Sequence, residues 1–187
     1  MSNLVILLLL ASAAFVLEEF ILIKPVFTIT QSDLLSKRLE TVAFWLPAFG
    51  MVATAATMGI FGGIRFAGLI NGVGLIFCAI GITLRYWARR TLGRFFTIGV
   101  VKQAGHQVIQ EGPYRLIRHP AYLAFMFFYT GFPLLIGNWV GLLILTLPAV
   151  FIFAWLTLVE DKRLAEELGK EYQEYQRHSA RLIPNIW

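Results

Sequence analysis

Charged residues are scarce in this sequence. They make up 14% of its 187 residues, and 58% of the residues are hydrophobic, whereas about 25% of an average soluble domain is charged. So little polar surface cannot cover a globule in water, and we therefore expect the chain to fold in a lipid bilayer. The high apolar content also excludes a disordered chain and a collagen-like chain.

Cysteine is almost absent, since Cys78 is the only one. A single cysteine cannot form an internal disulfide, which excludes a disulfide-stabilised scaffold. Cys78 lies within a continuous apolar run, so we expect a buried, unreactive thiol rather than a nucleophile.

The sequence is rich in long apolar segments. A helix that spans a membrane needs about 20 apolar residues, each of which adds about 1.5 Å to its length. Five segments reach or approach this length, at 4–23, 42–61, 66–87, 122–136 and 139–159. Residues 11–13 resemble a signal-peptide cleavage site, but no basic residue precedes them and the apolar run continues beyond them. We therefore expect an all-α integral membrane fold with five transmembrane helices.

The placement of basic residues tests this count. The segments that follow the first, third and fifth spans, counted with Arg85 near the end of the third span, hold 15 of the 16 Lys and Arg residues, and the opposite side has only Arg65. Because basic residues favour the cytoplasmic side, the N-terminus is predicted outside, with the 89–120 loop and the C-terminal tail in the cytoplasm. The tail is expected to contain an amphipathic helix at 160–177 that lies on the cytoplasmic leaflet.

Several residues within the spans also call for an interpretation. Gly68 and Gly72, with Gly74 and Gly81 nearby, indicate a surface for close helix packing, and Asn138 fits a turn. Glu160 and Asp161 end the fifth span, where carboxylates oppose the helix dipole. An acidic pair at that depth indicates a cationic partner.

Polar and aromatic side chains are densest at 105–122, which holds two histidines, two arginines and two tyrosines. His106 and His119 lie too far apart in the sequence to indicate a metal site, and no cysteine pair accompanies them. A patch for anionic lipid headgroups is one interpretation. The proline-fixed turns and the aromatic residues favour a shaped small-molecule site.

This cluster also resembles a known enzyme family. It reads Gly-His-x-x-Ile-x-x-Gly-Pro-Tyr-Arg-x-x-Arg-His-Pro-x-Tyr, and it is followed by the acidic pair, by Tyr172-x-x-Tyr175 and by Arg-Leu-Ile-Pro at 181–184. The order is similar to that of the isoprenylcysteine carboxyl methyltransferases. Related phospholipid N-methyltransferases share the Arg-His-Pro-x-Tyr element and the acidic pair. The resemblance extends from about Arg85 to Trp187, more than half of the chain.

The resemblance implies a single membrane-embedded methyltransferase domain over 1–187, which uses S-adenosylmethionine without a Rossmann fold. Residues 1–65 are accessory spans, and 85–187 form the cofactor-binding region. The positions that the resemblance assigns to the cofactor are Lys102, His106, Gln107, Val108, Ile109, Tyr114, His119, Pro120, Ala121, Tyr122 and Glu160. Arg118 and Glu160 are the candidates for positioning the reactants.

One position departs from the family pattern. Family members that methylate a prenylcysteine carboxylate carry an arginine four residues before the acid that matches Glu160, where it shares a helix face with that acid. Leu156 stands there instead and is the candidate substrate contact. A leucine cannot bind a carboxylate, so a neutral, amine or thiol-bearing lipophilic acceptor is at least as well supported.

Other functions remain open at this stage. The chain can be a phospholipid or amine N-methyltransferase, or a non-catalytic lipid-binding protein that retains the fold. A transporter is disfavoured because the sequence has no inverted repeat. The expected partners are membrane lipids and a lipophilic or lipid acceptor, without nucleic acid or metal.

Overall fold

The computed structural model describes residues 49–50, 52–54, 56, 68–95 and 108–184. The first expected span and most of the second lie outside these residues. Within them the secondary structure is helical, apart from one parallel β-bridge between Ile117 and Ala180.

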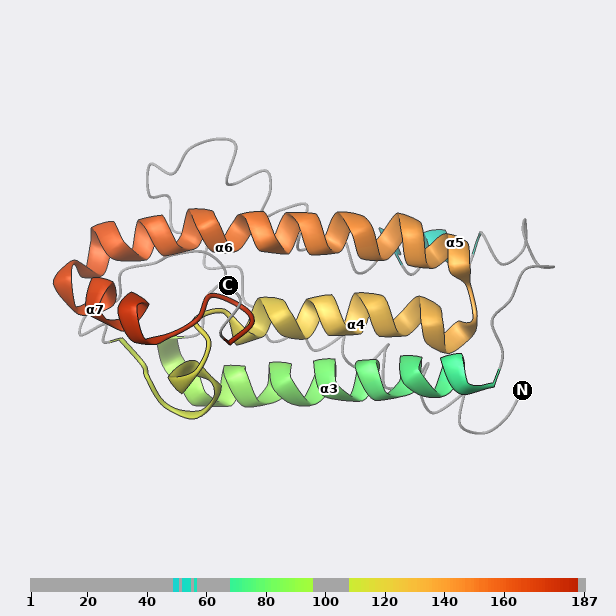
Figure 1. The fold of residues 1–187 in the computed structure, drawn as a ribbon, viewed down its shortest axis with the longest axis horizontal. Helices are drawn as coiled ribbons and strands as arrows, with labels where there is room; N and C mark the ends of the chain where they lie inside the picture. The colour runs from blue at the N-terminus through green and yellow to red at the C-terminus, as the bar shows by residue number, and fades with distance from the viewer. Residues whose placement is uncertain (1–48, 51, 55, 57–67, 96–107, 185–187) are drawn as a thin grey trace.

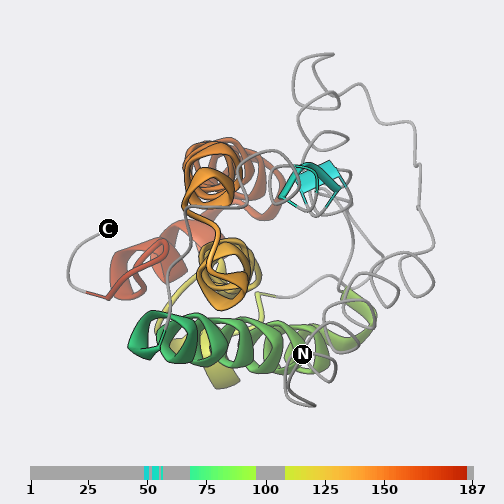
Figure 2. The same cartoon turned by 90° about the vertical axis from the view of Figure 1, so that its right-hand side faces the viewer.

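Three long helices lie side by side, with α4 antiparallel to the other two (Figure 1). They are α3 (Leu69–Leu92), α4 (Pro120–Ile136) and α6 (Leu147–Leu168). Figure 2 looks along α4 and α6 and shows α4 between α3 and α6. Short elements complete the described chain: η1 (Gly93–Phe95), η2 (Gly112–Arg115), α5 (Trp139–Gly141), η3 (Leu142–Thr146) and α7 (Lys170–His178).

Two of the described helical stretches are long and apolar enough to cross a membrane. One is α3, with 24 residues, and the other is the 30-residue stretch from Trp139 to Leu168. The latter is continuous through the π-helical η3, which ends two residues before Pro148, a residue without an N–H for the helical ladder. Helix α4 is apolar but has 17 residues, about 26 Å at 1.5 Å each.

The helix that carries the acidic pair does not end where the sequence predicts. Residues 139–159 were expected to form the span, whereas α6 continues to Leu168. Glu160 and Asp161 therefore lie inside a helix, where the dipole at a helix end does not act on them.

The expectation of one continuous helix over 160–177 is wrong. The chain turns at Gly169, whose φ of 64° lies in the left-handed region that glycine tolerates. Beyond it α7 folds back, and its Tyr172 and Tyr175 are buried. Figure 1 shows α7 and the C-terminal segment beside the start of α4.

Close packing of α3 on α4 depends on glycines. A Cβ atom added to Gly74 would lie 2.2 Å from the backbone nitrogen of Leu135, and one on Gly131 would lie 2.6 Å from the nitrogen of Cys78. Either contact is impossible without moving a helix. The expected small-residue surface therefore exists at Gly74 and at Gly81, where a Cβ would lie 2.8 Å from the Ala124 carbonyl oxygen. Gly72, in contrast, has no described atom within 4 Å of such a Cβ.

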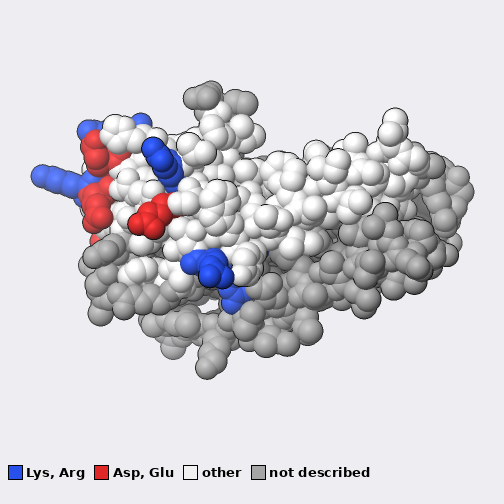
Figure 3. Space-filling view, turned by 90° about the horizontal axis from the view of Figure 1, so that it is seen from below, with Lys and Arg blue, Asp and Glu red and all other residues white. Residues whose placement is uncertain are grey.

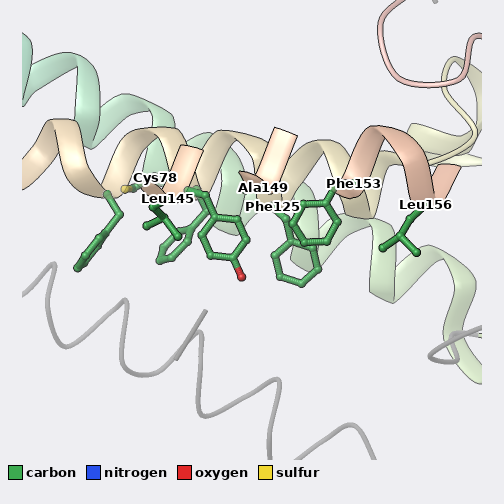
Figure 4. Close-up of a cluster of buried hydrophobic side chains, with 9 residues drawn as sticks. Cys78, Phe125, Leu145, Ala149, Phe153 and Leu156 are labelled. Atoms are coloured by element: carbon green, nitrogen blue, oxygen red, sulfur yellow. The ribbon is translucent and has the colours of Figure 1, made fainter. Parts of the chain in front are cut away.

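The core between the helices is aromatic. Phe153 of α6 stacks against Phe125 at 5.0 Å, Tyr122 at 5.6 Å and Tyr129 at 5.9 Å between ring centroids. Figure 4 shows Phe125 beside Phe153, with Leu156 further along α6. Cys78 belongs to the same cluster with 1% of its surface exposed, which confirms the buried thiol.

Charged side chains gather at one end of the molecule (Figure 3). In that view they occupy the half that carries α7, and the described surface of the other half has none. This end contains the start of α4, the last part of α6 and the C-terminal segment, so the polar residues that the sequence singled out meet there.

Candidate active site

Asp161 is the centre of the polar cluster. Its residue is 3% exposed, and its carboxylate accepts hydrogen bonds from four side chains. His119 Nε2 and the Tyr172 hydroxyl each lie 2.7 Å from Oδ1. The Nε of Arg181 lies 2.8 Å from Oδ2, and Arg118 contacts both oxygens at 3.1 to 3.3 Å.

The backbone brings these donors together. The nitrogen of Arg118 donates to the carbonyl of Ala180 at 2.8 Å, and that of His119 donates to the carbonyl of Arg181 at 3.2 Å. Ala180 donates in return to the carbonyl of Leu116 at 3.0 Å. This parallel pairing holds the tail against the entrance to α4, so that residues distant in sequence face one carboxylate.

Arg118 holds the C-terminal segment in place. Besides Asp161, its guanidinium donates to the backbone carbonyl of Gln176 at 3.1 Å and to that of Ser179. These bonds engage all three guanidinium nitrogens, and 8% of the side chain is exposed. The sequence marked Arg118 as a positioning candidate, and its contacts are with the protein's own tail.

His119 and Glu160 form the part of the cluster that reaches the surface. The Nδ1 of His119 lies 3.5 Å from Oε2 of Glu160, whose side chain is 25% exposed against 4% for His119. Burial lowers the pKa of His119, but the hydrogen bonds and negative charges of Asp161 and Glu160 outweigh it and raise that pKa above its ordinary value of 6.5. The two carboxylates on either side of the imidazole therefore favour its protonated form.

Helix α4 begins at this histidine. His119 is its N-cap residue, and Pro120 occupies the first turn, where its missing N–H costs nothing. The ring of Tyr122 stacks on that of His119, with centroids 5.7 Å apart and planes at 17°. Since Tyr122 also stacks on Phe153, an aromatic row connects the site to the core.

Tyr114 anchors the loop that precedes α4. Its side chain is buried, and its carbonyl accepts a 2.6 Å hydrogen bond from the Tyr175 hydroxyl. Burial raises the pKa of Tyr114, Tyr172 and Tyr175, so all three phenols stay neutral at physiological pH.

The remaining candidates differ in their placement. Lys102, His106 and Gln107 lie outside the described residues. Val108 and Ile109 are half-buried, and the nitrogen of Val108 donates to Oε1 of Glu171 at 3.4 Å. Pro120 is buried and Ala121 half-buried at the start of α4. Leu156 is 3% exposed in the aromatic core, one helical turn before Glu160.

Sequence reasoning missed the residues that organise the site. It assigned Glu160 to the site but gave Asp161, Tyr172 and Arg181 no individual role. The acidic pair and the Tyr-x-x-Tyr and Arg-Leu-Ile-Pro elements were visible signals. Arg85 was also missed: its guanidinium lies 4.3 Å from the centroid of the Phe125 ring, and the residue is 7% exposed.

Comparison with known proteins decides the family. The family model described as phospholipid methyltransferase matches residues 69–171, more than half of the chain. The chain belongs to the phospholipid methyltransferase family. The matched region includes α3, α4, α6 and the residues that converge on Asp161, except Tyr172 and Arg181.

Individual relatives agree with this assignment. The chain is 29% identical over 160 residues to a probable protein-S-isoprenylcysteine O-methyltransferase of Oryza sativa subsp. indica, covering 84% of this chain and 82% of the relative. It is 28% identical over 184 residues to protein-S-isoprenylcysteine O-methyltransferase A of Arabidopsis thaliana, covering 96% and 92%.

A solved structure shares the fold. It is described as the eukaryotic intramembrane Ras methyltransferase ICMT, and it matches with a TM-score of 0.64 at 24% identity, over 86% of this chain and 55% of that one. The chain is therefore an integral membrane enzyme, a methyltransferase of the isoprenylcysteine methyltransferase type. This confirms the resemblance seen in the sequence and argues against the non-catalytic and transporter alternatives.

Proposed function

We propose that this enzyme transfers the methyl group of S-adenosylmethionine to a lipophilic acceptor dissolved in the membrane. The observation that carries the proposal is the partly exposed Glu160 carboxylate beside the buried His119 imidazole. Both lie at the end of the molecule where the charged side chains gather.

The donor set fits the proposed cofactor. S-Adenosylmethionine has a sulfonium, an ammonium and a carboxylate, so its site needs one carboxylate and several donors. Asp161 is already bound by four side chains, which leaves Glu160 to face the cationic groups. The His119 imidazole, whose protonated form the two carboxylates favour, and the first turn of α4, which favours anions, suit the carboxylate.

The bound cofactor would supply a methyl group on a positively charged sulfur for in-line displacement by the acceptor. The chain's own residues would orient the reactants and shield them from water. His119 and Tyr122 would hold the amino-acid end, with Tyr114 and residues 106–109 lining the adenosine portion and Lys102, Pro120 and Ala121 nearby. Burial of Tyr114 and His119 keeps water from the reacting groups.

The side chain of Leu156 is relevant to which chemical group accepts the methyl. An apolar side chain in the core, one turn before Glu160, offers no charge to an acceptor carboxylate. This favours a thiol, an amine or another neutral group, reached sideways from the bilayer. A methanethiol S-methyltransferase of Pseudomonas deceptionensis, 30% identical over 73 residues and 39% of this chain, shows that a relative is named for a thiol acceptor.

Transfer to a phospholipid or amine nitrogen is the second candidate. The description of the matching family as phospholipid methyltransferase favours it. A lipid amine and a lipophilic thiol share the chemistry of a neutral nucleophile that reaches the site from the membrane.

We further propose five spans with the N-terminus outside and the site in the cytoplasm. The asymmetry of 15 basic residues against one supports this orientation. The charged end of the molecule in Figure 3 would then lie at the cytoplasmic surface, with α7 at the interface as an amphipathic helix in a single domain.

Calorimetric binding of S-adenosylmethionine and S-adenosylhomocysteine to the detergent-purified enzyme tests the cofactor site. We expect saturable binding by the wild type and binding at least about tenfold weaker in Glu160→Gln, which removes the charge. Glu166→Gln, on an exposed part of the same helix, is the matched control and should bind normally. A folded wild type that binds neither compound would overturn the proposal.

Methyl transfer from labelled S-adenosylmethionine then identifies the acceptor class. Lipophilic thiols, amines, phospholipids and prenylcysteine carboxylates would be compared in the same micelles. Transfer to prenylcysteine carboxylates alone would contradict the interpretation of Leu156.

A further inference from the structure

Two side chains of the C-terminal segment act on the carboxylate that holds His119. The Tyr172 hydroxyl shares Oδ1 of Asp161 with His119 Nε2, both at 2.7 Å. The Nε of Arg181 binds the other oxygen at 2.8 Å. The backbone carbonyl of Arg181 also accepts a hydrogen bond from the backbone nitrogen of His119 at 3.2 Å, whereas the side chains of Tyr172 and Arg181 act on the site through Asp161.

The position of Asp161 determines how the imidazole is turned. Because Nε2 of His119 is fixed on Oδ1, Nδ1 on the other side of the ring faces Glu160 at 3.5 Å. A carboxylate with two oxygens can rotate about its terminal bond. Donors on both oxygens, one from α7 and one from the tail, oppose that rotation.

We propose that Tyr172 and Arg181 are positioning residues for methyl transfer, which hold Asp161 so that His119 faces Glu160. The C-terminal segment, which packs against the entrance to α4, is then part of the site for the methyl donor. This inference rests on the proposed function, since it concerns the same His119 and Glu160.

The surroundings of His119 show why these residues have a measurable effect on it. The charged or titratable groups around the ring are Glu160 and Asp161 from α6, Tyr122 from α4, Arg118 from the loop, and, through Asp161, Tyr172 and Arg181. Removing a donor from Asp161 leaves its charge less compensated, which strengthens its attraction for the imidazolium. The pH at which His119 titrates should therefore rise.

The experiment compares Tyr172→Phe, Arg181→Gln and Arg181→Lys in the full-length enzyme. Tyr172→Phe removes one hydroxyl, and Arg181→Gln removes the charge that Arg181→Lys retains. Two properties are measured: the dissociation constant for S-adenosylhomocysteine, and the pH titration of the His119 ring followed by ¹⁵N NMR of histidine-labelled protein, with His119→Gln to identify its signals.

We expect Tyr172→Phe and Arg181→Gln to weaken binding about tenfold, as for loss of a hydrogen bond to a charged group, and to raise the titration midpoint of His119. Arg181→Lys should recover part of both. Thr146→Val is the control, because it removes a 3.0 Å hydrogen bond to the Tyr129 carbonyl at the other end of the molecule. It should lower the unfolding temperature without changing binding or the His119 titration.

The possible failures are distinguishable. A wild type that does not bind S-adenosylhomocysteine overturns the proposed function, while the NMR titration still tests the connection from Tyr172 through Asp161 to His119. A wild type that binds, with Tyr172→Phe and Arg181→Gln equal to it in affinity and in His119 titration, overturns the positioning role. If Tyr172→Phe does not fold, the comparison of Arg181→Gln with Arg181→Lys tests the positioning role by itself.

Discussion

The Tyr175 hydroxyl donates a 2.6 Å hydrogen bond to the backbone carbonyl of Tyr114, and both side chains are buried. This contact joins α7 to η2, which are separated by two long helices in the sequence. Together with the pairing of residues 116–119 with 180–181, it attaches the loop before α4 to the C-terminal segment. The loop before α4 and the C-terminal segment, which both contribute residues to the site, are thereby held as one unit.

Tyr175→Phe tests that attachment. Removing the hydroxyl leaves a buried carbonyl without its donor, and we expect a loss of about 1 to 3 kcal/mol of stability. Thermal unfolding in detergent micelles, followed by circular dichroism, measures it. Tyr86→Phe is the control, since the Tyr86 hydroxyl accepts an exposed hydrogen bond from Arg90, and its unfolding temperature should not change. Equal unfolding temperatures for all three proteins would contradict a stabilising role.

Gly74→Ala tests the contact between α3 and α4. The added Cβ would lie 2.2 Å from a backbone nitrogen of α4, so the helices must separate, at a cost of about 1 to 3 kcal/mol. Gly72→Ala, two residues away on an exposed face of the same helix, should leave the unfolding temperature unchanged or raise it slightly, because alanine favours the helix. A Gly74→Ala protein as stable as the wild type would show that this packing is absent.

The charge on His119 should make stability depend on pH. The pKa of His119 is raised above 6.5 in the folded protein, so the pairing of the imidazolium with the carboxylates contributes fully below pH 6.5. That contribution is lost as the pH rises through the higher folded-state pKa. The unfolding temperature should therefore fall as the pH rises above 6.5, and it should fall less in His119→Gln. Identical pH profiles would contradict the assignment.

Leu156→Arg should change acceptor preference at a cost in stability. The arginine would place a guanidinium one turn before Glu160, in a position where a cation is buried. We expect a lower unfolding temperature and a higher ratio of carboxylate to thiol methylation, measured with labelled methyl donor. Leu156→Met nearly conserves volume and should leave that ratio unchanged. An unchanged ratio in a folded Leu156→Arg protein would remove Leu156 from the acceptor site.

Much of the fold was predictable because apolar length is a local property. The segments 66–87, 122–136 and 139–159 all lie largely within described helices, and the enzyme class follows from motifs that remain contiguous in the sequence. The ends of the helices were less predictable. The break at Gly169 separates α6 from α7, and a continuous amphipathic stripe does not reveal a residue with positive φ.

The sequence by itself determined a membrane methyltransferase with an Arg-His-Pro element and an acidic pair at one end. Only the tertiary structure decided how the two acids divide their roles. Asp161 is one residue further round the helix than Glu160, so it faces inward to Arg118, His119, Tyr172 and Arg181, while Glu160 keeps an exposed edge. These partners come from a loop, α7 and the tail, and only backbone pairing and side-chain packing bring them to one carboxylate.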